Sequence, residues 1–195
     1  MPRVVDAVER RREIAEAVWR VIVREGLDHV SVRSVAREAG VSMGSLRHYF
    51  LTQAELLSFA MRTVMDRIER RLAALTLPDD PRAAAETALA ELLPLDSERA
   101  VENEVWLAFT ARAMVDPGLR SVRDEAHDRL RSGCQRWVRL LVPDGTTPAR
   151  VELETDRLFA LLDGLAVHAA VRPQEAISGR LTAVLHHHLG TIATS

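Results

Sequence analysis

The stretch SVRSVAREAGVSMGSLRHYF, residues 31–50, carries two short helix-like segments, each preceded by a serine. Ser31 and Ser42 stand where a helix would begin, and a serine oxygen accepts hydrogen bonds from the free amides of a first helical turn. The pattern predicts one helix at about residues 32–39 and a second at about 43–50.

Gly40 separates these two segments. Only a residue without a Cβ adopts the left-handed backbone conformation at low cost, so the chain can reverse there within a few residues. Helix, glycine turn and helix together match a helix-turn-helix, whose second helix enters the major groove of DNA. We expect its inward face to hold Val35, Val41, Leu46 and Phe50.

The other face of the second helix carries side chains suited to nucleic acid. An arginine such as Arg47 can donate two hydrogen bonds to a guanine, a contact worth about 1–3 kcal/mol of discrimination. The residues expected to project from its first two turns are Met43, Gly44, Arg47 and His48. Hydroxyl groups suit phosphate oxygens, and those expected near the DNA backbone belong to Ser31, Ser42, Tyr49 and Thr52. A glycine between two helices also occurs in ordinary helical bundles, where the same side chains would form a solvated face.

Composition and charge give little support of their own to DNA binding. All 26 basic residues are arginine, and the net charge of the 195-residue chain is −2. The first fifty residues have a balance of only +2, because they hold nine arginines and seven acids. A nucleic-acid function must therefore rest on geometry. One cysteine, no signal-peptide pattern and no long apolar run lead us to expect a cytoplasmic protein.

Helical periodicity continues along the chain, and no segment alternates as a strand does. The sequence predicts an all-α fold of about nine helices, with a helix-turn-helix DNA-binding domain over residues 1–54 and an effector-binding and dimerisation domain over 55–195. Besides the two helices above, we expect a long helix capped by Thr52 and helices at about 4–25, 82–93, 97–115, 118–142, 150–171 and 174–193.

The longer stretch SVRSVAREAGVSMGSLRHYFLTQAELL, residues 31–57, resembles the DNA-binding region of the tetracycline-repressor (TetR) family of bacterial transcriptional regulators. Two departures are visible. Arg47 stands where the family usually has an aromatic residue, and Gln53 stands where it usually has a lysine that pairs with phosphate. The resemblance implies contacts to the DNA backbone from Ser31, Tyr49 and Thr52, and contacts to bases from Arg33, Met43, Gly44, Ser45, Arg47 and His48.

Apolar stripes on the last two predicted helices suggest a homodimer. The segment LLDGLAVHAAVRP, residues 161–173, is similar to the C-terminal domain of BetI-type members of the family. A symmetric dimer would set two reading helices about 34–36 Å apart on a near-palindromic double-stranded operator. The alternative is that both stripes pack within one subunit. The expected interface residues are Leu158, Leu161, Leu162, Leu165, Ala169, Leu181, Val184, Leu185 and Leu189.

Convergent aromatic and apolar residues on the middle helices could line a pocket for a small-molecule effector, although such residues are more often plain core. They are Trp106, Phe109, Leu130, Cys134, Trp137 and Phe159. Aromatic rings near Glu102 or Glu104 would suit a cationic ligand.

No arrangement of nucleophile, base and orienting group appears, so we expect no enzyme and no cofactor. His186, His187 and His188 do not predict a metal site, because adjacent helical residues point about 100° apart. The sequence thus favours a homodimeric repressor that an effector releases from its operator. The alternative is a helical small-molecule-binding or interaction protein without useful DNA affinity.

Overall fold

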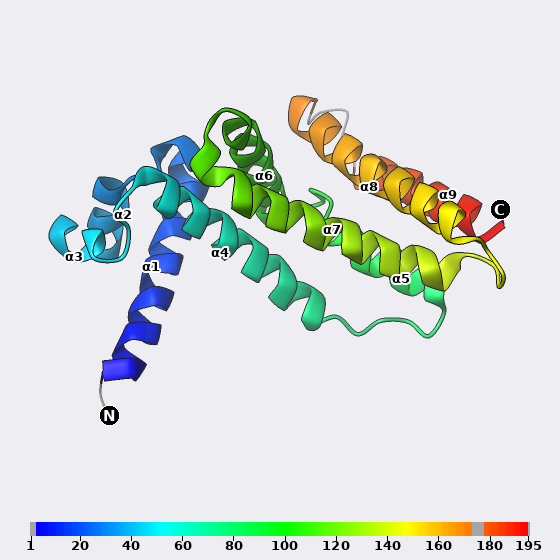
Figure 1. The fold of residues 1–195 in the computed structure, drawn as a ribbon, viewed down its shortest axis with the longest axis horizontal. Coiled ribbons are helices and arrows are strands. Elements are labelled where there is room, and N and C mark those ends of the chain that lie inside the picture. Colours follow the sequence, from blue (N-terminus) through cyan, green and yellow to red (C-terminus); the bar gives the residue numbers. More distant parts are fainter. Residues whose placement is uncertain (1–2, 173–177, 195) are drawn as a thin grey trace. The chain divides into compact units, whose positions relative to one another are not determined.

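A computed structural model describes residues 3–172 and 178–194 (Figure 1). Within these ranges the chain forms nine α-helices and two short 3-10 helices, and no strand occurs in them, which confirms the predicted all-α fold. The α-helices are α1 (Arg3–Glu25), α2 (Val32–Ala39), α3 (Met43–Arg47), α4 (Gln53–Ala73), α5 (Pro81–Ala90), α6 (Ser97–Val115), α7 (Arg120–Leu141), α8 (Pro148–Val171) and α9 (Ser178–Thr194). The 3-10 helices are η1 (Leu27–His29) and η2 (Pro117–Leu119).

Side-chain caps explain where several helices begin. Asp80 accepts a hydrogen bond from the Ala83 amide at the start of α5, and Thr147 accepts one from the Arg150 amide at the start of α8. Each cap is followed by a proline in the first turn, where the missing amide hydrogen costs nothing. For this reason α8 begins at Pro148, two residues before the predicted position.

Two predicted helices end early. α3 stops at Arg47, and residues 48–49 form a turn in which the Tyr49 amide bonds the Leu46 carbonyl at 3.0 Å. α5 stops at Ala90, and the residues after it tighten into turns, in which the Leu93 amide bonds the Ala90 carbonyl at 3.1 Å. Part of the last predicted helix, residues 174–177, lies outside the described residues.

By packing, the chain divides into two compact units. The first contains residues up to Arg67 together with Val105–Arg123, and the second contains Ile68–Glu104 together with the described residues from Asp124 onward. α4, α6 and α7 therefore each contribute to both units. The predicted boundary between a DNA-binding domain (1–54) and an effector-binding domain (55–195) refers to function. The division by packing does not test it, so it stays a prediction.

Each unit has its own core. In the first, the apolar residues that recur along one face of α1 are buried, with Ile14, Val18, Val21 and Ile22 all at most 2% exposed. The second is held by side chains from four helices that pack into one cluster, among them Leu89 of α5, Val138 of α7, Leu162 of α8 and Leu185 of α9. In the described ranges, no helix is long and apolar enough to cross a membrane.

Candidate nucleic-acid interface

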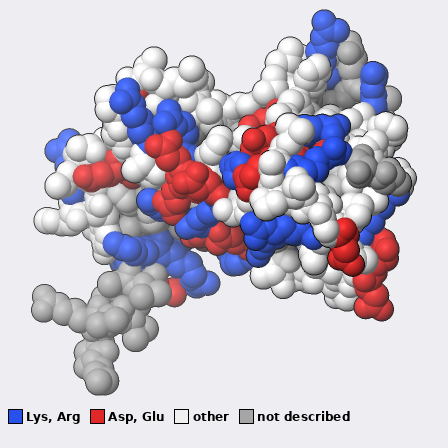
Figure 2. All heavy atoms as spheres, turned by 45° about the vertical axis from the view of Figure 1, so that its right-hand side comes forward, with Lys and Arg blue, Asp and Glu red and all other residues white. Residues whose placement is uncertain are grey.

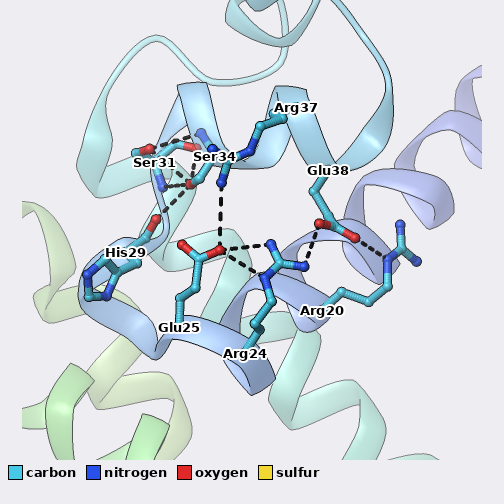
Figure 3. Close-up of polar contacts among 8 residues, drawn as sticks. All are labelled: Arg20, Arg24, Glu25, His29, Ser31, Ser34, Arg37 and Glu38. Atoms are coloured by element: carbon cyan, nitrogen blue, oxygen red, sulfur yellow. Dashed lines mark hydrogen bonds and ion pairs between the residues drawn. The ribbon is translucent and has the colours of Figure 1, made fainter.

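The helix-turn-helix begins with two serines that cap each other's backbone (Figure 3). The Ser34 amide donates to the Ser31 hydroxyl oxygen at 3.1 Å, and the Ser31 amide donates to the Ser34 hydroxyl oxygen at 2.9 Å. The Ser34 hydroxyl also lies 2.7 Å from the His29 carbonyl oxygen, which it bonds as a donor. This arrangement fixes the start of α2 against η1, and it confirms the predicted cap.

The turn between α2 and α3 has the predicted geometry. Gly40 has φ 67° and ψ 28°, the left-handed conformation that favours glycine. Ser42 then accepts a hydrogen bond from the Ser45 amide at 3.0 Å and caps α3. Leu46 is fully buried, and Phe50, also buried, packs against the Phe59 ring of α4 with centroids 4.9 Å apart. The inward face of α3 is therefore anchored, and its other face is free to meet a partner.

Two carboxylates of this unit hold a group of arginines between α1 and α2 (Figure 3). Glu38 accepts hydrogen bonds from Arg20 at 2.7 Å and from Arg24 at 2.9 Å. Glu25 lies 2.8 Å from Arg24 and 3.6 Å from Arg37. The hydrogen bond from Arg20, followed by that from Arg24, holds the pKa of Glu38 below its usual value. These arginines brace the fold, so they add little to the field that attracts DNA.

Arg33 of α2 and Arg47 of α3 behave differently. Both side chains are exposed, and neither forms an ion pair with any acid in the described part of the chain. On the face drawn in Figure 2, arginine and acidic side chains alternate in small groups. Arg33 and Arg47 therefore differ from the paired arginines of the same unit in having no acidic partner among the described residues.

The other predicted base-facing residues also lie near the surface. Met43 is 50% exposed, Gly44 and His48 are exposed, and Ser45 is half-buried. Among the predicted backbone contacts, Tyr49, Ser42 and Thr52 are exposed. Ser42 and Thr52 accept amide hydrogen bonds as helix caps and keep their own O–H groups for an acceptor such as phosphate. The Ser31 hydroxyl is half-buried and lies 2.9 Å from the Ser34 hydroxyl.

Gln53 has a role that the sequence did not reveal. Its side-chain amide nitrogen donates to the Val30 carbonyl oxygen at 2.5 Å and so ties the start of α4 to the turn before α2. The sequence identified Gln53 only as the replacement of a phosphate-binding lysine. A contact between positions 23 residues apart leaves no periodic signal that could have predicted it.

The predicted dimer-interface residues divide into two groups. One group lies inside the subunit's own core, where a covered side chain has almost no surface to offer a second chain. This group consists of Leu158, Leu162, Ala169, Leu181, Leu185 and Leu189. The three that retain exposed surface are Leu161, Leu165 and Val184.

The predicted effector-pocket residues also divide. Cys134 lies in the core of the second unit, with Leu130, Trp137 and Phe159 packed against it and partly exposed. Phe109, which is fully buried, and the half-buried Trp106 belong to the first unit. Four of the six predicted pocket residues therefore pack together in the second unit, and the other two belong to the first.

The acids proposed to attract a cationic ligand differ in their availability. The buried carboxylate of Glu102 accepts hydrogen bonds from Arg71 at 2.6 and 3.0 Å, so its charge is already balanced. This contact also raises the pKa of Arg71. Glu104 is exposed.

The structure also shows the surroundings of the single cysteine and of two of the three consecutive histidines. Burial raises the pKa of the Cys134 thiol to about 12, with the charge of Asp163 adding to the effect. His186 of α9 contacts two residues of α5, with Nδ1 2.8 Å from Glu86 and Nε2 3.1 Å from Arg82. His188 has its pKa lowered, first by burial and then by the charge of Arg157.

A helix-turn-helix DNA-binding protein is the class that this geometry defines. Residues 14–58 match the model of the tetR family of bacterial regulatory proteins, and residues 81–194 match that of the BetI-type transcriptional repressor C-terminal domain. The chain is 38% identical to the HTH-type transcriptional regulator PksA of Bacillus subtilis over 98% of its own length and 94% of that protein.

Solved structures agree with these matches. A transcriptional regulator from Rhodococcus sp. Rha1 superposes with a TM-score of 0.81 at 34% identity, over 94% of this chain and 96% of that one. The multidrug binding protein EbrR, crystallised with ethidium, superposes with a TM-score of 0.68 at 26% identity, over 92% and 98% of the two chains. The chain belongs to the TetR family and is a DNA-binding transcriptional regulator with a BetI-type C-terminal domain.

Proposed function

We propose that this protein is a homodimeric repressor that binds a near-palindromic operator in the cytoplasm and leaves it when a small-molecule effector binds. The observation that supports DNA binding is that Arg33 and Arg47 are exposed and not held by an acidic side chain. Neighbouring arginines are held by Glu25 and Glu38, whereas these two are exposed on the helix-turn-helix without an acidic partner in the described ranges.

The test is fluorescence anisotropy with the duplex that lies upstream of the protein's own reading frame. We expect tighter binding to this duplex than to a scrambled duplex of the same composition at about 0.15 M salt, where non-specific phosphate contacts are weakened. Equal binding to both duplexes would reject the repressor. It would favour the alternative, a helical binding protein without useful DNA affinity.

The surface proposed for dimerisation is the edge of α8 and α9 formed by Leu161, Leu165 and Val184. These residues flank the buried face of their helices and retain exposed surface. Leu161→Glu and Val184→Glu place a charge there, so each is expected to yield monomers in light scattering. Val167→Glu serves as the matched control, because Val167 is 42% exposed on α8 on the side away from the core. If Val167→Glu also yields monomers, the interface is not confined to the edge formed by Leu161, Leu165 and Val184.

The effector class we propose is a planar aromatic cation. Trp137 and Phe159 are partly exposed in the second unit, and aromatic faces attract cations. EbrR, a structural relative, was crystallised with ethidium and with proflavin. Ethidium titrations should quench tryptophan fluorescence in the wild type, less in Trp137→Phe, and should lower operator affinity in parallel. Quenching by anions or neutral lipids alone would reject a cationic effector.

A further inference from the structure

Gly44 has no structural reason to be a glycine. Its φ is not positive, and apart from its two chain neighbours and the backbone of its own helix, the nearest atom to a Cβ added there would be the Ser42 hydroxyl oxygen, at 3.8 Å. A glycine also weakens a helix relative to alanine. The fold therefore tolerates a side chain at this position, and the glycine leaves an open space on the exposed surface of α3.

The side chains around this space are those of Met43, Arg47 and His48. Arg47 and His48 stand three and four residues after Gly44, so they neighbour it on the helix surface. All three are exposed, whereas Leu46 is buried on the opposite side of α3. The outer surface of α3 thus consists of the bare Gly44 backbone, with Met43 about 100° to one side of it around the helix and Arg47 one turn further along.

In the major groove, thymine presents a C5-methyl group, and guanine presents two acceptors that match an arginine fork. A methyl group fits a small space beside a thioether, and a guanine fits an unpaired guanidinium. We infer that each operator half-site holds a thymine whose methyl group lies over Gly44 against Met43, and close to it a guanine that Arg47 reads. This inference rests on the proposed DNA-binding function.

The helix also sets the spacing of the two bases. Met43 and Arg47 are four residues apart, which is about 6 Å along the axis of an α-helix. Successive base pairs rise by about 3.4 Å. The thymine and the guanine should therefore lie within about two base pairs of each other. They need not lie on the same strand, because both present their groups in the major groove.

The test starts from the duplex that the wild-type protein enriches from a randomised library. In synthetic copies, deoxyuridine replaces each thymine in turn, which removes only the methyl group, and 7-deazaguanine replaces each guanine, which removes one acceptor. We expect one thymine per half-site whose methyl is worth about fourfold in Kd, the value of one buried methyl group. At one guanine nearby, replacement by 7-deazaguanine should raise Kd about tenfold.

Variants assign each effect to its side chain. Met43→Ala should bind the thymine and deoxyuridine duplexes equally, and Arg47→Ala should lose its response to 7-deazaguanine. Gly44→Ala should prefer deoxyuridine, because its Cβ takes the place of the methyl group, while its melting temperature does not fall. Met114→Ala is the control, since Met114 is 69% exposed at the end of α6. It should keep the wild-type preferences.

The outcomes separate this inference from the proposed function. If the library yields no enriched sequence, the DNA-binding function itself fails. If a sequence is enriched but no thymine methyl contributes, or if its contribution persists in Met43→Ala, the protein binds DNA and the reading assigned to α3 is overturned. A Gly44→Ala variant that binds both duplexes as the wild type does would overturn it as well.

Discussion

Gly118, in the turn between α6 and α7, lies so close to Ala54 at the start of α4 that a Cβ added to it would be 3.0 Å from the Ala54 Cβ. The same Cβ would be 3.2 Å from Oδ1 of Asp116, which accepts a hydrogen bond from the Gly118 amide. The neighbouring Gln53 bonds Val30. Two adjacent residues of α4 thus contact the α6–α7 turn and the segment leading into α2, all within the first unit.

Gly118→Ala should disturb this junction. The added methyl group must displace Ala54 or Asp116, and overpacking of this kind costs about 1–3 kcal/mol of unfolding free energy. Because Ala54 adjoins Gln53, we also expect operator affinity to fall several-fold. Thermal unfolding and anisotropy measure the two effects separately.

Two further variants test whether the contact itself is responsible. Gly133→Ala adds a methyl group to α7 where no atom lies within 4 Å, so it should be neutral or slightly stabilising. The double variant Gly118→Ala with Ala54→Gly removes the clash and should recover part of the lost affinity. Identical affinities in Gly118→Ala and the wild type would show that the junction does not position the helix-turn-helix.

Glu38→Gln tests the brace between α1 and α2. The pKa of Glu38 is lowered in the folded protein by Arg20 and Arg24, so the folded state binds a proton at this site less readily than the unfolded chain. The stabilisation is therefore present above the ordinary glutamate pKa of about 4.3 and is lost as the pH falls through the lowered value. We expect Glu38→Gln to melt below the wild type at pH 7, and we expect the difference to shrink as the pH falls below the ordinary glutamate range.

A matched variant is Glu13→Gln, which removes one partner of the exposed pair between Arg10 and Glu13 on α1. Such surface pairs contribute little. A pH-dependent difference of the same size in both variants would contradict a specific role for Glu38.

Arg47→Ala and Tyr49→Phe should separate base reading from backbone contact. Arg47 is exposed and has no acidic partner among the described residues, so its loss should reduce the ratio of operator to scrambled-duplex affinity. The Tyr49 hydroxyl is expected at a phosphate oxygen, so its loss should weaken both complexes by the same factor. Competition anisotropy with both duplexes measures each ratio. If both variants lose affinity and discrimination together, this division of roles is wrong.

The sequence predicted what depends on neighbouring residues. Ser31, Gly40 and Ser42 act through backbone groups three or four positions away, and such local chemistry can be recognised in a single chain. It could not predict that Glu38 holds Arg20 or that Gln53 holds Val30. These contacts arise only when α1, α2 and α4 have packed, and charged residues on a helix do not show which helix they will meet.

The apolar stripes on α8 and α9 show a second kind of limit. Periodicity finds the apolar face of a helix, but it does not distinguish a face that meets the same chain from one that meets a second chain. Leu158 and Leu189, expected at the interface, are fully buried in their own subunit. Val184 and Leu185 are adjacent members of the same stripe, yet Val184 keeps 37% of its surface exposed and Leu185 only 1%. The packing of the neighbouring helices makes that difference, and the sequence of α9 alone does not contain it.

The Cys134 thiol should be unreactive toward thiol reagents in the folded protein. Burial raises the pKa of its thiol to about 12, so at pH 8 only about one thiol in ten thousand is ionised, and the thiolate is the reactive form. We expect Ellman's reagent to label the native protein at pH 8 very slowly and the guanidinium-unfolded protein at once. The unfolded thiol ionises near pH 8.5, well before the folded one, so this residue should also lower stability as the pH rises from about 9 towards 12. Rapid labelling of the native protein, with operator release as a consequence, would instead show a thiol that senses oxidants.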